Sequence, residues 1–199
     1  MPIGAARNAV DCALWDLEAK LAGKRVWELT EISKHLAADG KSEPGSVTTV
    51  YTLSLDTPEK MGEAAAKHAK RPNLKIKLTG DGDLERLAAI SENAPNSRLV
   101  VDANEGWTPE HYQRFVPELK LLGVEMIEQP FPADKDSILK TLDRPLPVCA
   151  DESCHDTGDL ERLKGLYEFV NIKLDKTGGL TEALHLQAQA ENMGFRTMV

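Results

Sequence analysis

The sequence is poor in several residue types that mark common classes of protein. Its 199 residues include only three cysteines and 5% aromatic residues, and basic side chains (24) are fewer than acidic ones (32). Three cysteines without a CxxC pair argue against a disulfide scaffold and fit a reducing compartment. The net charge of −8 disfavours nucleic acid or an anionic membrane as the main partner. A small-molecule site, including one built around a cation, stays open.

Long apolar segments are also lacking. No run approaches the ~20 residues that span a bilayer. The N-terminal MPIGAARNAV has neither the basic region nor the apolar core of a signal peptide. With 41% hydrophobic and 28% charged residues, the chain has the composition of a folded globular protein. We therefore expect a cytoplasmic protein with a sizeable buried core.

What the sequence does contain is an alternation of short apolar segments with segments of helical periodicity. The strands recur about every 25 residues, which suits a strand, a loop and a crossover helix. Thr57-Pro58 and Thr108-Pro109 each place Thr at a helix N-cap and Pro in the first turn. The expected strands are residues 47–54, 74–78, 98–102, 124–128, 147–151, 169–174 and 195–199.

Repeated β-α units predict a parallel sheet with helices outside it. The expected fold class is α/β, a parallel (β/α) barrel. A complete eight-stranded barrel needs roughly 250 residues. This chain begins just before a helix and stops inside the seventh expected strand, so we expect an incomplete barrel. Residues 1–46 are expected to form an entering helix and a linker, and residues 47–199 the partial barrel.

Ionisable residues occupy equivalent positions at the ends of five consecutive expected strands. They are Lys77, Asp102, Glu128, Asp151 and Lys173. The C-terminal ends of parallel barrel strands meet at one rim, where active sites lie, so these side chains should gather there. Taken singly, each acid is better explained as the start of a loop that caps the next helix. On three consecutive strands, the acids favour a metal site.

Three carboxylates in one pocket would repel one another, and a divalent cation relieves that repulsion. Ligands that are all oxygen favour Mg²⁺, with Mn²⁺ as a substitute. The predicted ligands are Asp102, Glu128 and Asp151.

The lysines flank these acids in strand order, with Lys77 before them and Lys173 after them. A base on each face of a bound molecule can remove a proton on one side and return it on the other. Lys75 lies two residues from Lys77, so both face the same side of their strand, and a neighbouring positive charge disfavours a second ammonium group. The alternative is that Lys75 and Lys77 are solvated residues of an edge strand.

These motifs resemble the enolase superfamily, in particular the muconate-lactonising-enzyme subgroup and its dipeptide epimerases of the Ala-Glu type. The resemblance is carried by LKIKL (74–78), VDANEGW (101–107), IEQPF (127–131), CADES (149–153), NIKLDKTGGL (171–180) and the helix at 5–21. It implies that an N-terminal capping domain and the last barrel strand are absent, so that the chain is truncated at both ends.

The resemblance implies an isomerase that epimerises a dipeptide by 1,1-proton transfer through an ene-diolate, with Mg²⁺ and two acid/base lysines. It implies that Thr52 and Lys75 contact the substrate, with supporting roles for Asn104 and Glu152. Three alternatives share the ene-diolate step: N-acylamino-acid racemase, a muconate-type cycloisomerase and o-succinylbenzoate synthase. The substrate is thus a dipeptide or an acyl amino acid.

Two further alternatives stay open. A barrel with two unpaired edges exposes apolar surface, which favours a non-catalytic fragment that forms homo-oligomers. Gly178-Gly179, just before an expected helix, is compatible with an anion site or with a plain tight turn.

Overall fold

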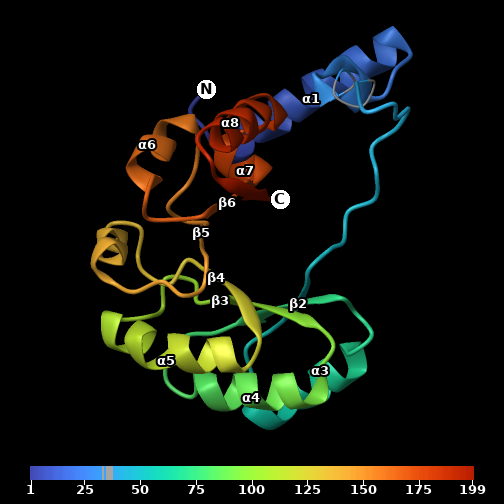
Figure 1. Cartoon of the computed structure of the whole chain (residues 1–199). Coiled ribbons are helices and arrows are strands. Elements are labelled where there is room, and N and C mark those ends of the chain that lie inside the picture. The colour runs from blue at the N-terminus through green and yellow to red at the C-terminus, as the bar shows by residue number, and fades with distance from the viewer. Residues whose placement is uncertain (33, 35–37) are drawn as a thin grey trace.

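The computed structural model describes residues 1–199 except 33 and 35–37. It contains a parallel sheet of seven strands that follow sequence order from β1 to β7. The sheet curls into part of a barrel with helices along its outer side (Figure 1). The predicted fold class, an incomplete parallel (β/α) barrel, is confirmed.

The strands lie at the predicted places, and most are shorter than predicted. β3 (Arg98–Asp102) and β4 (Val124–Glu128) have the predicted bounds, and both are central strands with a partner on each side. The others are β1 (Tyr51–Leu53), β2 (Asn73–Lys77), β5 (Val148–Ala150), β6 (Phe169–Asn171) and β7 (Arg196–Met198).

Two of the helices begin at the predicted capping residues. The Thr57 hydroxyl accepts a hydrogen bond from the Lys60 amide at 3.4 Å, and the Thr108 hydroxyl accepts one from the His111 amide at 3.2 Å. The crossover helices are α3 (Pro58–His68), α4 (Asp83–Asn93), α5 (Pro109–Leu121) and α8 (Leu180–Asn192). Shorter turns are η2 (Asp136–Thr141), η3 (Thr157–Asp159), α6 (Leu160–Leu163) and α7 (Leu174–Thr177).

Alternation along β2 separates the core from the polar interior of the barrel. Leu74 and Ile76 are fully buried in the hydrophobic core, which also contains Leu87 of α4. Lys75 and Lys77 therefore point to the opposite side, towards the barrel interior. The same side chains that hold the helices on the sheet thus fix the direction of the two lysines.

The first helix, α1 (Ala5–Ala22), lies beside α7 and α8, and η1 (Val26–Leu29) follows it. Residues 44–50 then run without helix or strand to β1 (Figure 1). The apolar stripe of α1 is solvent-exposed, because the helix contacts α8 through Asp11 and Trp15. The stripe consists of Val10, Leu14, Leu17 and Leu21, which are 46–80% exposed.

The three cysteines, Cys12, Cys149 and Cys154, are free thiols. In the part of the chain that the structure describes, none of the helices has the length and apolar character of a membrane span.

Candidate active site

Lys75 and Lys77 enter the site from β2 on the same side, as predicted. Their ammonium groups lie 2.8 and 2.7 Å from Asp102 Oδ2, at the end of β3. Lys75 Nζ also lies 2.7 Å from Glu128 Oε2, at the end of β4. Asp102 and Glu128 are paired in register, so one ammonium group bridges two adjacent carboxylates.

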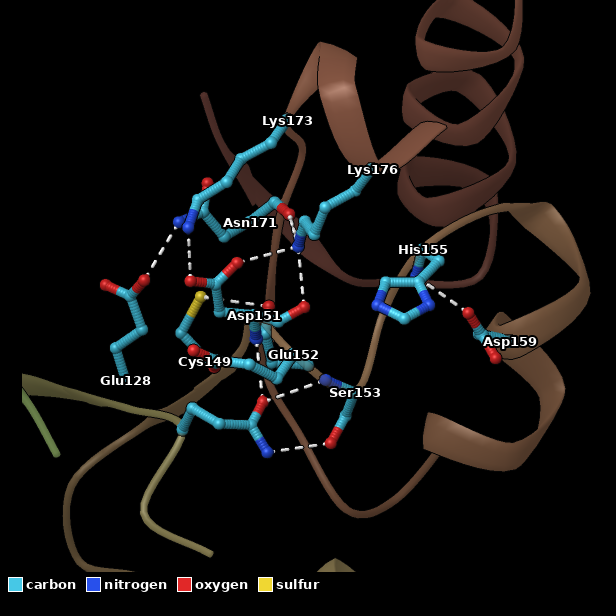
Figure 2. Close-up of polar contacts among 12 residues, drawn as sticks. Glu128, Cys149, Asp151, Glu152, Ser153, His155, Asp159, Asn171, Lys173 and Lys176 are labelled. Atoms are coloured by element: carbon cyan, nitrogen blue, oxygen red, sulfur yellow. Dashed lines mark hydrogen bonds and ion pairs between the residues drawn. The ribbon is translucent and has the colours of Figure 1, made fainter. Parts of the chain in front are cut away.

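The carboxylates of this cluster are withdrawn from water. Asp102 and Glu128 are fully buried, and Glu128 Oε1 accepts a hydrogen bond from Asn171 Nδ2 at 2.9 Å (Figure 2). Burial and the negative charge of Asp102 raise the pKa of Glu128. Burial also works against the charge on Lys75, but attraction to Glu128 and hydrogen bonds to both acids outweigh it and raise the pKa of Lys75.

Asp151 follows β5 and is compensated by two lysines. Lys173 contacts Asp151 Oδ2, and Lys176 Nζ lies 2.7 Å from Oδ1 (Figure 2). Burial would raise the pKa of Asp151, but hydrogen bonds from Lys173 and Lys176 lower it below its ordinary value. Burial likewise disfavours the charged form of Lys173, but the Asp151 carboxylate outweighs this effect and raises its pKa.

The two residues predicted to have supporting roles lie between the acids. Asn104 Oδ1 accepts a hydrogen bond from Lys77 Nζ at 2.5 Å, and Asn104 Nδ2 donates one to Glu152 Oε1 at 3.2 Å. The backbone amide of Asn104 donates a hydrogen bond to Asp102 Oδ1 at 3.0 Å. Asn104 thus connects the end of β3 with the segment after β5.

Thr52 lies further out. It is an exposed residue of the edge strand β1, in register with Lys75. Among the described residues, no hydrogen bond or ion pair joins Thr52 to the lysines or the acids. Its predicted contact with a substrate stays a prediction.

Sequence reasoning missed three residues that build the site: Lys176, Asn171 and Gln129. Gln129 Oε1 accepts hydrogen bonds from the amides of Asp151 and Ser153 at 2.8 and 3.1 Å, which fixes the segment after β5. Two signals were present. Asn171 and Lys173 are two residues apart in an extended segment, and Lys176 follows Lys173 by about one helical turn.

The donor chemistry of the site suits a hard cation, because three buried carboxylates supply only oxygen ligands. Their negative charge is compensated here by ammonium groups from four lysines. Within residues 1–32, 34 and 38–199, no group of three or more His, Cys, Asp or Glu side chains is arranged to hold a metal ion. The charge and burial of the acids fit a cation, whereas their present arrangement is an ion-pair network with lysine.

Fold and site together define a protein of the (β/α)-barrel class with its polar cluster at the C-terminal strand ends. Residues 60–199 match a family model described as enolase C-terminal domain-like. Residues 1–30 match the N-terminal domain of the mandelate racemase and muconate lactonizing enzyme family. The chain therefore belongs to the enolase superfamily. The match at residues 1–30 assigns α1, expected to enter the barrel, to that N-terminal domain family.

Two curated relatives of the chain are a racemase and an epimerase. The chain is 46% identical to an N-acetyl-D-glutamate racemase from Pseudoalteromonas sp. and 45% identical to the L-Ala-D/L-Glu epimerase of Escherichia coli K12. In both comparisons the whole chain matches 60% of the relative, so it spans less than two thirds of the length of either.

Solved structures that resemble this chain are also described in terms of dipeptide epimerases. One is an enolase family member from Agrobacterium tumefaciens with homology to dipeptide epimerases, with bound sodium and L-Ala-L-Glu. It has a TM-score of 0.91 and 48% identity, over 100% of this chain and 58% of that one. Another is the dipeptide epimerase from Enterococcus faecalis V583 complexed with Mg and L-Leu-L-Tyr. Its TM-score is 0.87 at 32% identity, over 98% and 55% of the two chains.

Proposed function

We propose that the chain carries the proton-transfer site of a Mg²⁺-dependent dipeptide epimerase of the Ala-Glu type. The observation that supports this most is the placement of Lys77 and Lys173. They come from β2 and from the segment just after β6, on opposite flanks of the acids at the ends of β3, β4 and β5. Two lysines on opposite flanks, one as a neutral amine and the other as an ammonium group, suit the removal of a proton on one face and its return on the other.

In this proposal Asp102, Glu128 and Asp151 hold the Mg²⁺ ion. When bound, the ion polarises the substrate carboxylate and stabilises negative charge that develops on it. A cation at these acids would also compensate charge that is compensated now by lysine. Lys77 and Lys173 would then be free to exchange protons with a substrate.

Solvent exposure separates the four lysines into two pairs. The Lys77 and Lys173 side chains are 33% and 42% exposed, so they can reach a molecule at the mouth of the barrel. Lys75 and Lys176 are each 13% exposed and are enclosed among the acids. We assign proton transfer to the exposed pair, in which one amine accepts the proton from the α-carbon and the other ammonium group donates one to it. Lys75 is assigned to the substrate carboxylate.

A second candidate is N-acylamino-acid racemisation, which the N-acetyl-D-glutamate racemase supports. Ala-Glu and N-acetylglutamate are both glutamate acylated on nitrogen, so the same proton transfer serves either substrate. They differ in the ammonium group of the alanyl residue. Incubation of the chain with each substrate in parallel, and comparison of kcat/KM, decides between the two candidates. A higher value for N-acetyl-D-glutamate would favour the second.

The test of the lysine assignment is epimerisation of L-Ala-L-Glu in D₂O, followed by NMR. We expect the parent chain to invert the glutamyl α-carbon and to incorporate deuterium. Lys77→Ala and Lys173→Ala should each lower the rate of epimerisation by about 10²–10⁴-fold, the usual contribution of a positioned acid or base. Lys67→Ala, at an exposed position of α3, is the matched control. Epimerisation at the parent rate by either site variant would contradict the assignment.

A further inference from the structure

The N-terminus of α8 is capped by a side chain from another helix. Gly179, at the N-cap position, has no side chain to offer. Asp11 of α1 takes that role: its Oδ2 accepts a hydrogen bond from the Thr181 amide at 3.0 Å, and its Oδ1 accepts one from the Thr181 hydroxyl at 2.7 Å. Trp15 Nε1 donates to the same hydroxyl at 2.9 Å. A carboxylate here compensates the positive end of the helix dipole.

The two glycines before α8 make room for this contact. A Cβ atom at position 179 would lie 2.4 Å from the Asp11 Cβ, and one at position 178 would lie 3.0 Å from Arg7 Cδ. Both glycines also have positive φ, +76° at Gly178 and +130° at Gly179. The sequence left open whether Gly178-Gly179 forms an anion site or a tight turn. In the structure it is a tight turn, and the anionic group beside it is the Asp11 carboxylate.

The capped turn is continuous with the segment that bears the lysines. The Gly179 amide donates to the Leu174 carbonyl at 2.9 Å, and the Thr177 hydroxyl donates to the Gly179 carbonyl at 2.9 Å. The Thr177 amide donates to the Lys173 carbonyl at 3.0 Å. Hydrogen bonds therefore join residues 173–181 into one unit, with the lysines of the site near one end and Asp11 at the other.

We propose that Asp11 is a positioning residue: from α1 it caps α8 and so holds the α7 turn that places Lys173 and Lys176 at Asp151. The contact joins the part of the chain that matches the N-terminal domain family to the part that matches the barrel family. The effect of Asp11 on catalysis rests on the proposed function, whereas its effect on the structure of residues 173–181 does not.

The first experiment follows amide hydrogen exchange by mass spectrometry in the parent chain and in Asp11→Ala. Exchange over residues 174–183 should become about fivefold faster, as expected for the loss of a capping bond. Asp16→Ala is the matched control, because Asp16 is an exposed acid of the same helix that pairs with Lys20 at 2.6 Å. Exchange in the same segment should be unchanged in that control.

The second experiment measures epimerisation of L-Ala-L-Glu by the same variants. Asp11→Ala should lower kcat about tenfold and leave KM within about twofold, because a misplaced proton donor slows the chemical step more than binding. Asp11→Asn should fall between Asp11→Ala and the parent, because its amide oxygen keeps one of the two acceptor positions. Thr181→Val, which removes only the hydroxyl, serves if Asp11→Ala does not fold.

The outcomes separate the two proposals. Unchanged exchange over residues 174–183 in Asp11→Ala would overturn the capping role. Faster exchange with unchanged kcat would overturn the positioning role. A parent chain without activity on either acylated glutamate would overturn the proposed function, and the exchange result would still decide whether Asp11 holds the turn.

Discussion

Asp151 is buried next to two lysines that follow it by 22 and 25 residues in the sequence. A buried carboxylate is costly unless it is paired and hydrogen-bonded, and here both of its oxygens are engaged. The same rule explains Lys75 between Asp102 and Glu128. At the level of single residues, each buried acid of the site is therefore paired with at least one lysine ammonium group.

This pairing predicts a pH-dependent stability at Asp151. Its pKa in the folded chain lies below its ordinary value, and the unfolded value is about 3.9. The ion pairs therefore stabilise the folded chain above about pH 4, and the stabilisation is lost as the pH falls through the folded-state pKa. In EDTA, Asp151→Asn should lower the unfolding free energy by about 3 kcal/mol at pH 7. The difference from the parent should narrow below about pH 4.

Urea denaturation of the parent and of Asp151→Asn between pH 7 and pH 3 measures this difference. Asp134→Asn, at an exposed acid, is the control and should differ little from the parent at any pH. A difference for Asp151→Asn that stays constant across the range would show that the ion pairs do not hold the carboxylate ionised.

The acids of the candidate site could be predicted from the sequence, because each lies at the end of a strand or directly after it, and register places strand ends together. Lys176 was missed, because its one-turn spacing from Lys173 indicates a contact with Asp151 only once the single-turn helix α7 is placed there. A four-residue helix has no periodicity to detect. The cap that Asp11 forms on α8 could not be predicted either, because 170 residues separate Asp11 from Thr181.

Among the elements, α5 has the fullest local signal. Thr108 accepts from the His111 amide at 3.2 Å, and His111 Nδ1 accepts from the Thr108 amide at 3.4 Å. Such reciprocal caps satisfy two amides that the helix cannot satisfy itself. Helices of this kind could be placed from sequence alone.

Loss of this cap should be measurable at the level of the element. Thr108→Ala should lower the unfolding free energy by about 1 kcal/mol, because the His111 amide loses its acceptor. Thr48→Ala, in the segment before β1, is the control because Thr48 is exposed. Chemical denaturation of both variants tests this, and equal effects would show that the cap contributes nothing specific.

Other elements departed from the sequence prediction for reasons of context. The first strand was expected over residues 47–54 and is limited to Tyr51–Leu53, since β1 is an edge strand with β2 as its partner in the described sheet. The apolar stripe of α1 has the residue spacing of one face of a helix. It could not show which side of α1 would be covered, because that depends on the polar contacts of Asp11 and Trp15 with α8.

At the scale of the whole molecule, the cluster of acids and lysines forms ion pairs between residues from different strands. Its members come from β2, β3 and β4 and from the segments after β5 and β6, which include most of the described sheet. A ligand that binds this cluster therefore connects side chains from several strands of the described sheet. Binding of such a ligand should therefore raise the free energy of unfolding of the whole chain.

Mg²⁺ should therefore raise the melting temperature of the chain. A ligand that binds only the folded state stabilises it by about 2.7 kcal/mol at a hundred times its Kd, and for a chain of this length that corresponds to about 5–10 °C. Thermal melting in EDTA and in excess MgCl₂, at equal ionic strength set with KCl, measures the shift. Asp102→Asn should abolish the shift, and Asp134→Asn should retain it. If melting in EDTA and in MgCl₂ coincided, the three acids would not form a cation site, and the lysine pairs would be their permanent partners.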